Sequence, residues 1–474
     1  MNFGIFTVDT SVALEFFSQG PWNIITQLIA LGGWLILFFL VFVALFHFYV
    51  ELVEDLAVHK WEYVTLAIDI PALNVQTPKA VEQMFSHIAG ALSKPDLKDI
   101  LLDGYKQRYF SFEIISIEGY IQFLVWTEVA FRDLIEAAVY AQYPDAEIIE
   151  VEDYVSGIPD KYPDKDYDVW VSDFGLAEND AYPLRSYSEF EHSISKDTVL
   201  KDPMGTFLES FTRLTPGEQM WFQIVVEPID NSWKEHAIEK IKEVIGEKKS
   251  HGTDYTGILV SGLMRFLELL GDEIFNREAS PAATHEEKKD APNQLQYLTP
   301  GMKNLVEAME KKIAKIGLKT KIRGVYAARK EIFNPRRGVN AMLGAINQYN
   351  IPSSNSIVPT LTASGSSPKK IKRKNLLIKA YKKRKIGVGG NSFVLNIEEL
   401  ATIWHFPMSH VKTPQVQKSA NKQAEPPGGL PVERLMKELP LETPAEAAHN
   451  SGRKHYKTDT GEIIEYDDPF QNLP

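Results

Sequence analysis

Hydrophobic and polar positions alternate regularly from Trp61 onwards, which predicts strands and amphipathic helices in turn. The residues from Val64 to Ile70 have the two-residue period of a half-buried strand. A helix is expected next, with Thr77 as its N-cap, Pro78 at its first position and Pro95 beyond its end. The first elements are therefore a strand followed by a helix.

The next stretch predicts a hairpin, a helix and a closing strand. Two alternating runs are joined at Glu118 and Gly119, where the glycine accepts a positive φ. A second helix is expected after Thr127, and a strand is expected at residues 147–151. The order strand, helix, strand, strand, helix, strand is the split βαβ arrangement of ferredoxin-like domains. It predicts such a domain over residues 60–153, without indicating any chemistry.

A second copy of the same arrangement is expected within residues 166–407. Its elements are a strand at 184–190, a helix at 203–214, strands at 219–226 and 320–328, a helix after Asn334 and Pro335, and a last strand at 392–395. A helical insertion, residues 229–318, interrupts its hairpin. The insertion has expected helices at 231–245, 258–275 and from Thr299 and Pro300 to Gly317, with a polar stretch at 276–292 and a capping box of Ser232 and Glu235. The fold class is therefore α+β, with two tandem ferredoxin-like domains.

Residues 24–46 are the longest apolar run, with no charge and Gln27 as the one strongly polar side chain. As a helix the run is about 35 Å long, against a hydrocarbon core of roughly 30 Å. A cleaved signal peptide is disfavoured, because no basic segment precedes the run and no small-residue cleavage site follows it. We therefore expect a transmembrane helix over residues 24–50. Residues 1–23 contain no Lys or Arg, whereas Lys60 follows the helix, which favours an N-terminus outside and a cytoplasmic C-terminal part.

The composition supports folded domains and excludes several kinds of chemistry. The chain has 474 residues, of which 44% are hydrophobic, and it has no cysteine. Disulfides, thiolate metal sites and cysteine nucleophiles are therefore excluded. Residues 351–368 are rich in Ser, Pro and Thr and are expected to be a linker, and residues 408–474 are expected to be a Pro-rich, largely disordered tail. Within the tail, Tyr456 to Tyr466 could form a small hairpin, a docking motif or a flexible end.

Charge is concentrated in one segment. The net charge is −12, yet residues 369–385 contain ten Lys or Arg and no acid. Such a segment neutralises phosphates of nucleic acid or of anionic lipid headgroups, and an aromatic ring within it can stack on a base. The alternative is a solvated basic linker. The candidate binding residues are Lys369, Lys370, Lys372, Arg373, Lys374, Lys379, Tyr381, Lys382, Lys383, Arg384 and Lys385.

No motif of an enzyme is present. There is no GxxxxGK[ST] loop, and the glycine cluster at residues 387–393 lacks the lysine that binds phosphates. No HExxH or GxSxG occurs either. Glu399 follows Asn396 at the spacing of a capping box, and His405 follows the end of that helix, so both have structural explanations. We therefore expect no catalytic residue, no metal and no cofactor, and we do not interpret the chain as an enzyme.

Several segments together resemble a known family. They are FSFEIISIEGYIQFLVWT from Phe110 with YAQYPDAEI from Tyr140, GEQMWFQIVVEP from Gly217, IKAYKKRK from Ile378 and LNIEELATIWHFP from Leu395. This set is similar to the membrane-anchored N-terminal region that precedes the motor domain in bacterial conjugation-type ATPases, the coupling and motor proteins of type IV secretion. The resemblance spans residues 61–407. In that family an ATPase follows a proline-rich linker such as residues 423–431 here, but this chain has no Walker motif.

The resemblance implies an adaptor that is anchored in the bacterial cytoplasmic membrane by a single pass and docks a separate AAA/RecA-like ATPase, or a remnant without such a motor. The residues expected to dock this partner are Asn396, Glu399, Trp404, His405 and Pro407, where the family's motor domain would be joined. The other expected partners are the lipid bilayer and either DNA or an anionic lipid, and assembly into a homo-oligomer stays open. The alternative function is a membrane-tethered protein that binds nucleic acid or anionic lipid through residues 369–385.

Overall fold

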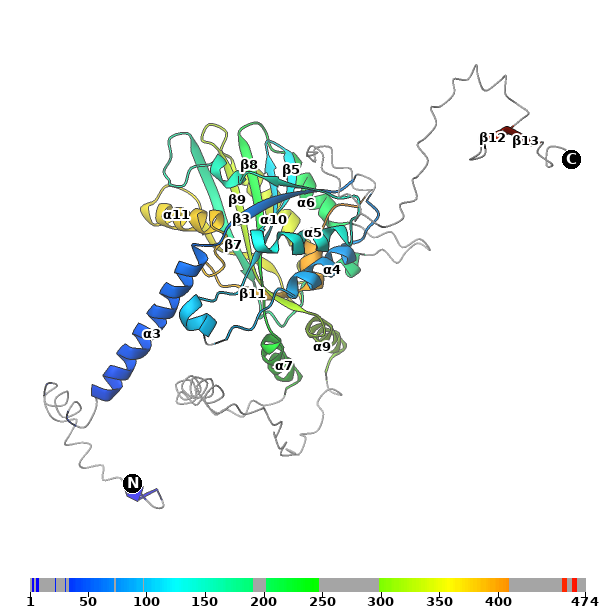
Figure 1. Ribbon diagram of the computed structural model, residues 1–474. Coiled ribbons are helices and arrows are strands. Elements are labelled where there is room, and N and C mark those ends of the chain that lie inside the picture. The colour runs from blue at the N-terminus through cyan, green and yellow to red at the C-terminus, as the bar shows by residue number, and fades with distance from the viewer. Residues whose placement is uncertain are drawn as a thin grey trace. The chain divides into compact units, whose positions relative to one another are not determined.

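The computed structural model describes residues 34–190, 202–246 and 298–408, except for 72, 73 and 97, together with a few short pieces nearer the ends (Figure 1). Those pieces include two small hairpins. One pairs β1 (Asn2–Phe3) with β2 (Phe6–Thr7), and the other pairs β12 (Lys454–Lys457) with β13 (Ile463–Tyr466). The second pairing is the hairpin alternative expected around Tyr456 to Tyr466. It belongs to a compact unit of its own, Glu425–Pro474, whereas all the other elements belong to Met1–Ala424.

A nine-stranded antiparallel sheet with helices forms the main unit, so the expected α+β class is correct. Eight strands follow the order β10-β7-β9-β8-β4-β5-β3-β6, and β11 pairs with one end of β9. The strands are β3 (Tyr63–Asp69), β4 (Phe110–Ile117), β5 (Tyr120–Glu128), β6 (Glu147–Val151), β7 (Tyr167–Leu176), β8 (Glu218–Pro228), β9 (Gly317–Arg329), β10 (Ile357–Ala363) and β11 (Phe393–Asn396).

The first half of the sheet contains β4, β5, β3 and β6, in that order. Its helices are α4 (Pro78–Ala89), after β3, and α5 (Arg132–Tyr140), after β5. The chain therefore follows the expected order of a split βαβ unit. Glu118 and Gly119 both have positive φ, at 56° and 92°, which makes the tight turn between β4 and β5.

The second half repeats this order as β8, β9, β7 and β10. Its helices are α6 (Pro203–Thr212), after β7, and α10 (Pro335–Asn347), after β9. One predicted strand was wrong, and another is a strand with a different role. Residues 184–190 contain a 3₁₀ turn, Tyr187–Phe190, and the first strand is β7. The last strand is β10, inside the expected linker, whereas Phe393–Asn396 extends the sheet beside β9.

β10 was missed because it is an edge strand. It pairs only with β7 among the described strands, and its register shifts between Pro359 and Leu361. An edge strand tolerates a proline and polar residues, because one of its sides needs no hydrogen-bonded neighbour. The Pro, Ser and Thr content that predicted a linker is therefore compatible with a strand at this position.

The two halves share a single sheet because β4 pairs with β8 along residues 110–117. Apolar side chains of α4, α5, α6, α10 and α12 (Ile397–Ile403) form the larger core on one face, and α11 (Pro368–Lys382) covers a smaller core on the other face (Figure 1). In the insertion, α7 (Ser232–Ile245) packs against α9 (Pro300–Ile313) through Trp233, Ala237, Ile241, Val306 and Met309. The expected helix at residues 258–275 lies outside the described residues.

The expected transmembrane helix is not supported. No helix in the described part of the chain is long and apolar enough to cross a membrane. The helix found there, α3 (Trp34–Val58), begins inside the expected span, and its second half contains Glu51, Glu54 and Asp55. The second half of α3 contacts the chain near residue 101, where the Tyr49 hydroxyl donates to the Leu101 carbonyl at 2.9 Å. The predicted single-pass localisation, with the bilayer as a partner, is corrected by this finding.

Candidate functional site

A row of buried polar side chains crosses the centre of the sheet on the face that α11 covers. Glu113 of β4 lies opposite Gln223 of β8, Gln223 opposite Arg323 of β9, and Arg323 opposite Asp173 of β7. All four side chains are fully buried. Buried polar groups are costly unless they are paired, so the segment that covers this row has to supply partners.

Those partners come from the end of the basic segment and from the residues just after it. Arg384 donates to Glu113 at 3.0 and 3.1 Å and to Asp153 at 2.8 Å. Gln223 donates to the Tyr381 carbonyl at 3.2 Å, and Arg323 donates to the Val388 carbonyl at 2.7 Å. The amide of Gly390 closes the row by donating to Asp173 at 2.7 Å. The chain after α11 is thus fixed to the middle of the sheet by charge-assisted hydrogen bonds.

The electrostatics of this cluster agree with its geometry. Burial alone would lower the pKa of Arg384, but the charges of Glu113 and Asp153 hold that pKa well above its ordinary value. Burial and the Glu113 charge raise the pKa of Tyr154 and of Tyr381, whose hydroxyls are 2.9 Å apart. Arg384 therefore stays charged, and both phenols stay neutral.

The basic segment is consequently divided between the core and the surface. Lys374 pairs with Asp168, Lys382 pairs with Asp160, and Tyr381 and Arg384 are buried. The prediction that Lys374, Tyr381 and Arg384 bind a ligand is therefore corrected, because these side chains are buried. The side chains that remain exposed are those of Lys369, Lys370, Lys372, Arg373, Lys379, Lys383 and Lys385.

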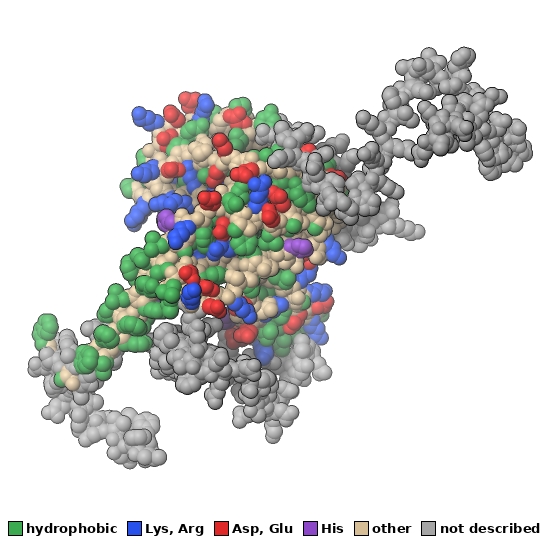
Figure 2. All heavy atoms as spheres, viewed as in Figure 1, with side chains coloured by type: hydrophobic (Ala, Val, Ile, Leu, Met, Phe, Trp, Pro, Cys, Tyr) green, Lys and Arg blue, Asp and Glu red, His purple; other side chains and the backbone are tan. Residues whose placement is uncertain are grey.

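Four of the seven exposed cations follow one face of α11. Lys369, Lys372, Leu376, Lys379 and Lys383 recur at intervals of three and four residues, so they lie on one side of the helix. Blue side chains gather at the left edge of Figure 2, where Figure 1 places α11. In the part of the chain that the structure describes, none of the seven exposed cations forms an ion pair, whereas the buried members of the segment do.

The residues predicted to dock a partner do not form a surface. Asn396, Glu399, Trp404 and His405 are buried, and Pro407 is half-buried. Asn396 and Glu399 form the expected capping box of α12. The Trp404 ring packs among the rings of Phe85, Phe112, Phe123 and Phe406, and His405 bonds to Asp202 at 2.8 Å. The sequence LNIEELATIWHFP therefore builds the core, and the docking prediction is corrected.

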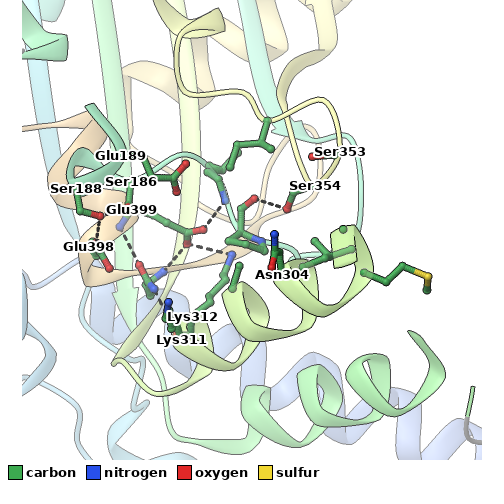
Figure 3. A pocket seen from close by; sticks show the side chains of 18 of the residues that line it. Ser186, Ser188, Glu189, Asn304, Lys311, Lys312, Ser353, Ser354, Glu398 and Glu399 are labelled. Carbon is green, nitrogen blue, oxygen red and sulfur yellow. Dashed lines mark hydrogen bonds and ion pairs between the residues drawn. The ribbon is translucent and has the colours of Figure 1, made fainter. Parts of the chain in front are cut away.

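A pocket of about 790 Å³ lies between α9, residues 183–189 and the start of α12. Lys312 and Glu399 meet in its middle at 3.0 Å, with Ser186 and Ser188 on one side and Ser354 on the other (Figure 3). Glu399 also accepts the amide of Leu184 at 2.8 Å. The charges of Lys312 and Glu399 are thus already paired within the protein. In the described part of the chain no group of three His, Asp or Glu side chains could hold a metal ion.

The buried row was missed at the sequence level, although it leaves a signal. Glu113, Gln223, Arg323 and Asp173 each interrupt an apolar strand, as in FSFEIISI and MWFQIVVEP. A charged residue in the middle of an otherwise buried strand requires a partner. The matching cation, Arg384, stands in a basic run, where its special environment cannot be distinguished from that of its neighbours.

Comparison with known proteins identifies the family. A family model described as "Domain of unknown function (DUF8128)" matches residues 71–419, which contain every strand of the sheet except β3. That description names no activity and makes no connection with conjugation-type ATPases. No curated protein matches the chain. Because the match covers more than half of the chain, this protein belongs to the family of the domain of unknown function DUF8128.

Proposed function

We propose that this protein binds nucleic acid through the exposed face of α11, as a non-enzymatic adaptor of a type IV secretion-like translocation machine whose motor is a separate ATPase. The observation that carries the proposal is the set of seven exposed cations at residues 369–385, which have no ion pair among the described residues, in a chain of net charge −12. A cluster of this sign on an acidic protein favours a polyanionic ligand.

The geometry supports contact with a phosphate backbone. α11 has 15 residues and is therefore about 22 Å long. Its exposed lysines lie in line along that length, as successive phosphates do along a strand. Its inner face is held by Leu377, Ile378 and Tyr381 in the smaller core. The cations thus stand on a rigid support, which lowers the entropy lost when a ligand binds.

The test compares two sets of four substitutions in the full chain. The first set, Lys369→Gln, Lys372→Gln, Lys379→Gln and Lys383→Gln, removes the row on α11. The control set removes four exposed lysines from other parts of the sequence: Lys79→Gln, Lys94→Gln, Lys98→Gln and Lys303→Gln. Both sets change the net charge by the same amount. A difference between them therefore reports the position of the charges and not their number.

Binding of a fluorescent oligonucleotide is measured by anisotropy over a range of salt concentrations. We expect the first set to weaken binding at least about 10-fold and to reduce the salt dependence, because fewer counterions are released. The control set should bind within about twofold of the natural chain, and both sets should keep its thermal melting curve. Equal binding by the two sets would contradict the proposal.

The adaptor part of the proposal needs a docking surface other than the buried residues 396–405. The helical insertion is the better candidate, since Ile238, Met302 and Ile316 are exposed apolar side chains there. Ile238→Glu and Met302→Glu should lower ATP hydrolysis in the complex purified from native cells, by releasing the motor. Ile332→Glu, at an exposed apolar residue after β9, is the control. Undiminished ATP hydrolysis in both insertion variants would remove the insertion as the docking surface.

A further inference from the structure

A second pocket, of about 490 Å³, lies at the C-terminal end of the α11 row. It is lined by the last turn of α3, by strands of the first half of the sheet and by residues 382–385, all of which are described. The last two exposed cations of the basic segment, Lys383 and Lys385, are therefore part of the pocket wall. A ligand that lies along α11 would therefore extend into this pocket.

Aromatic rings line the pocket. Tyr63 stacks on Trp126, with ring centroids 4.1 Å apart and planes inclined by 14°, and Tyr109 lies 5.8 Å from Trp126. Trp126 is only 7% exposed, whereas both tyrosines are half-buried. Burial raises the pKa of Tyr63 and of Tyr109, so both phenols are neutral near pH 7 and do not repel an anion.

The charges around the rings favour an anionic ligand. Asp153 is paired with Arg384, and Glu150 is paired with Arg132 at 3.1 Å. Lys382 is likewise held by Asp160. Among the lining residues this leaves Lys383 and Lys385 as unpaired cations against Asp55. The pocket thus combines half-exposed aromatic rings with a small excess of positive charge.

We propose that this pocket receives an unpaired base of a single-stranded nucleic acid whose phosphates lie along α11. Aromatic rings beside a positively charged track are the usual platform for single strands, because every base offers a face for stacking. A base in a duplex is already stacked and paired, so it does not enter the pocket without being extruded. The inference rests on the proposed function and adds to it a preference for single strands.

The natural full chain is tested first with three fluorescent 20-mers: a single strand of deoxythymidine, an abasic strand of the same length and a duplex. We expect the deoxythymidine strand to bind about 10-fold more tightly than the abasic strand, which has the same phosphates and no bases. It should also bind more tightly than the duplex. This comparison needs no variant, so a failure to fold cannot obscure it.

Three substitutions then locate the effect. Tyr63→Leu should weaken binding of the deoxythymidine strand about 10-fold and leave the duplex and the abasic strand unchanged. Tyr63→Phe, which keeps the ring, should bind as the natural chain does. Tyr120→Leu is the control, since Tyr120 is an exposed aromatic residue at the start of β5, outside the pocket.

The possible outcomes separate the inference from the proposed function. If all three ligands bind equally and the α11 variants abolish that binding, the proposed function stands and the base pocket is wrong. If Tyr63→Leu weakens duplex and single strand alike, the pocket is wrong as well, because a general loss does not reflect stacking. If none of the three binds at low salt, both the pocket and the proposed function are wrong.

Discussion

Arg384 and Glu113 form a buried ion pair between residues that lie 271 positions apart in the sequence. Glu113 belongs to the first half of the sheet, whereas Arg384 follows α11, which comes after β10, the last strand of the second repeat. The pair therefore fixes the basic segment across the junction of the two halves. It explains why part of a highly charged run lies in the interior.

Replacing Arg384 should destabilise the protein strongly. Arg384→Gln leaves Glu113 buried without its cation, and breaking a buried pair in this way costs about 3–5 kcal/mol. The neighbouring exposed residue supplies the control, since Lys383→Gln should change the free energy of unfolding by less than about 0.5 kcal/mol. Chemical denaturation of both variants measures the difference. Equal stability of the two would mean that the pair contributes nothing.

Two glycines of α10 should respond to alanine in opposite directions. A Cβ at Gly338 would lie 2.6 Å from a ring carbon of Tyr326, which is fully buried and cannot move freely. Gly338→Ala should therefore cost about 1–3 kcal/mol. Gly344 has nothing within 4 Å of that position, so Gly344→Ala should stabilise the helix by about 0.5–1 kcal/mol. Thermal melts decide the signs, and two changes of the same sign would contradict this packing.

Asp202 should make the protein sensitive to acid. Its burial alone would raise the pKa of its carboxyl group, but His405 and the amides of Met408 and Met204 lower it below the ordinary value. A lowered pKa means that the stabilisation is complete above the unfolded pKa, about 3.9, and disappears as the pH falls through the folded value. Asp202→Asn should remove this dependence.

Urea unfolding between pH 2.5 and pH 6 tests the dependence. The difference in stability between the natural chain and Asp202→Asn should be largest above about pH 4 and should shrink in acid. The same analysis of Asp145→Asn, at an exposed carboxylate, is the control. A difference that stays constant over the whole range would show that the folded pKa of Asp202 is not lowered.

The sequence predicted the elements whose signals are local. Thr299 and Pro300 open α9 as expected, and the turn at Glu118 and Gly119 has the positive φ that its residues favour. The capping box of Ser232 and Glu235 was wrong, because α7 begins at Ser232 itself and the Ser232 hydroxyl donates to Asp230. Caps are decided within one turn of a helix, so a small shift of its start changes which residue fills the cap.

The features that sequence reasoning missed depend on distant partners. β10 becomes a strand through its pairing with β7, some 190 residues earlier. The burial of Arg384 depends on Glu113, and the burial of Trp404 depends on four phenylalanines, three of them from the strands and helix α4 of the first repeat. Such positions have the local pattern of a linker, a basic tail or a docking motif. Their three-dimensional environment, not their own sequence, decides between these alternatives.

The pairing of β4 with β8 has a consequence for how the protein can be divided. Each of these strands is the outermost strand of its own repeat, so separating the repeats would expose two long backbone edges at once. Unpaired edges of this kind are templates for intermolecular sheet formation and aggregation. Either repeat produced alone would therefore need a new cover for that edge. The pairing consequently makes each repeat depend on the other for its solubility.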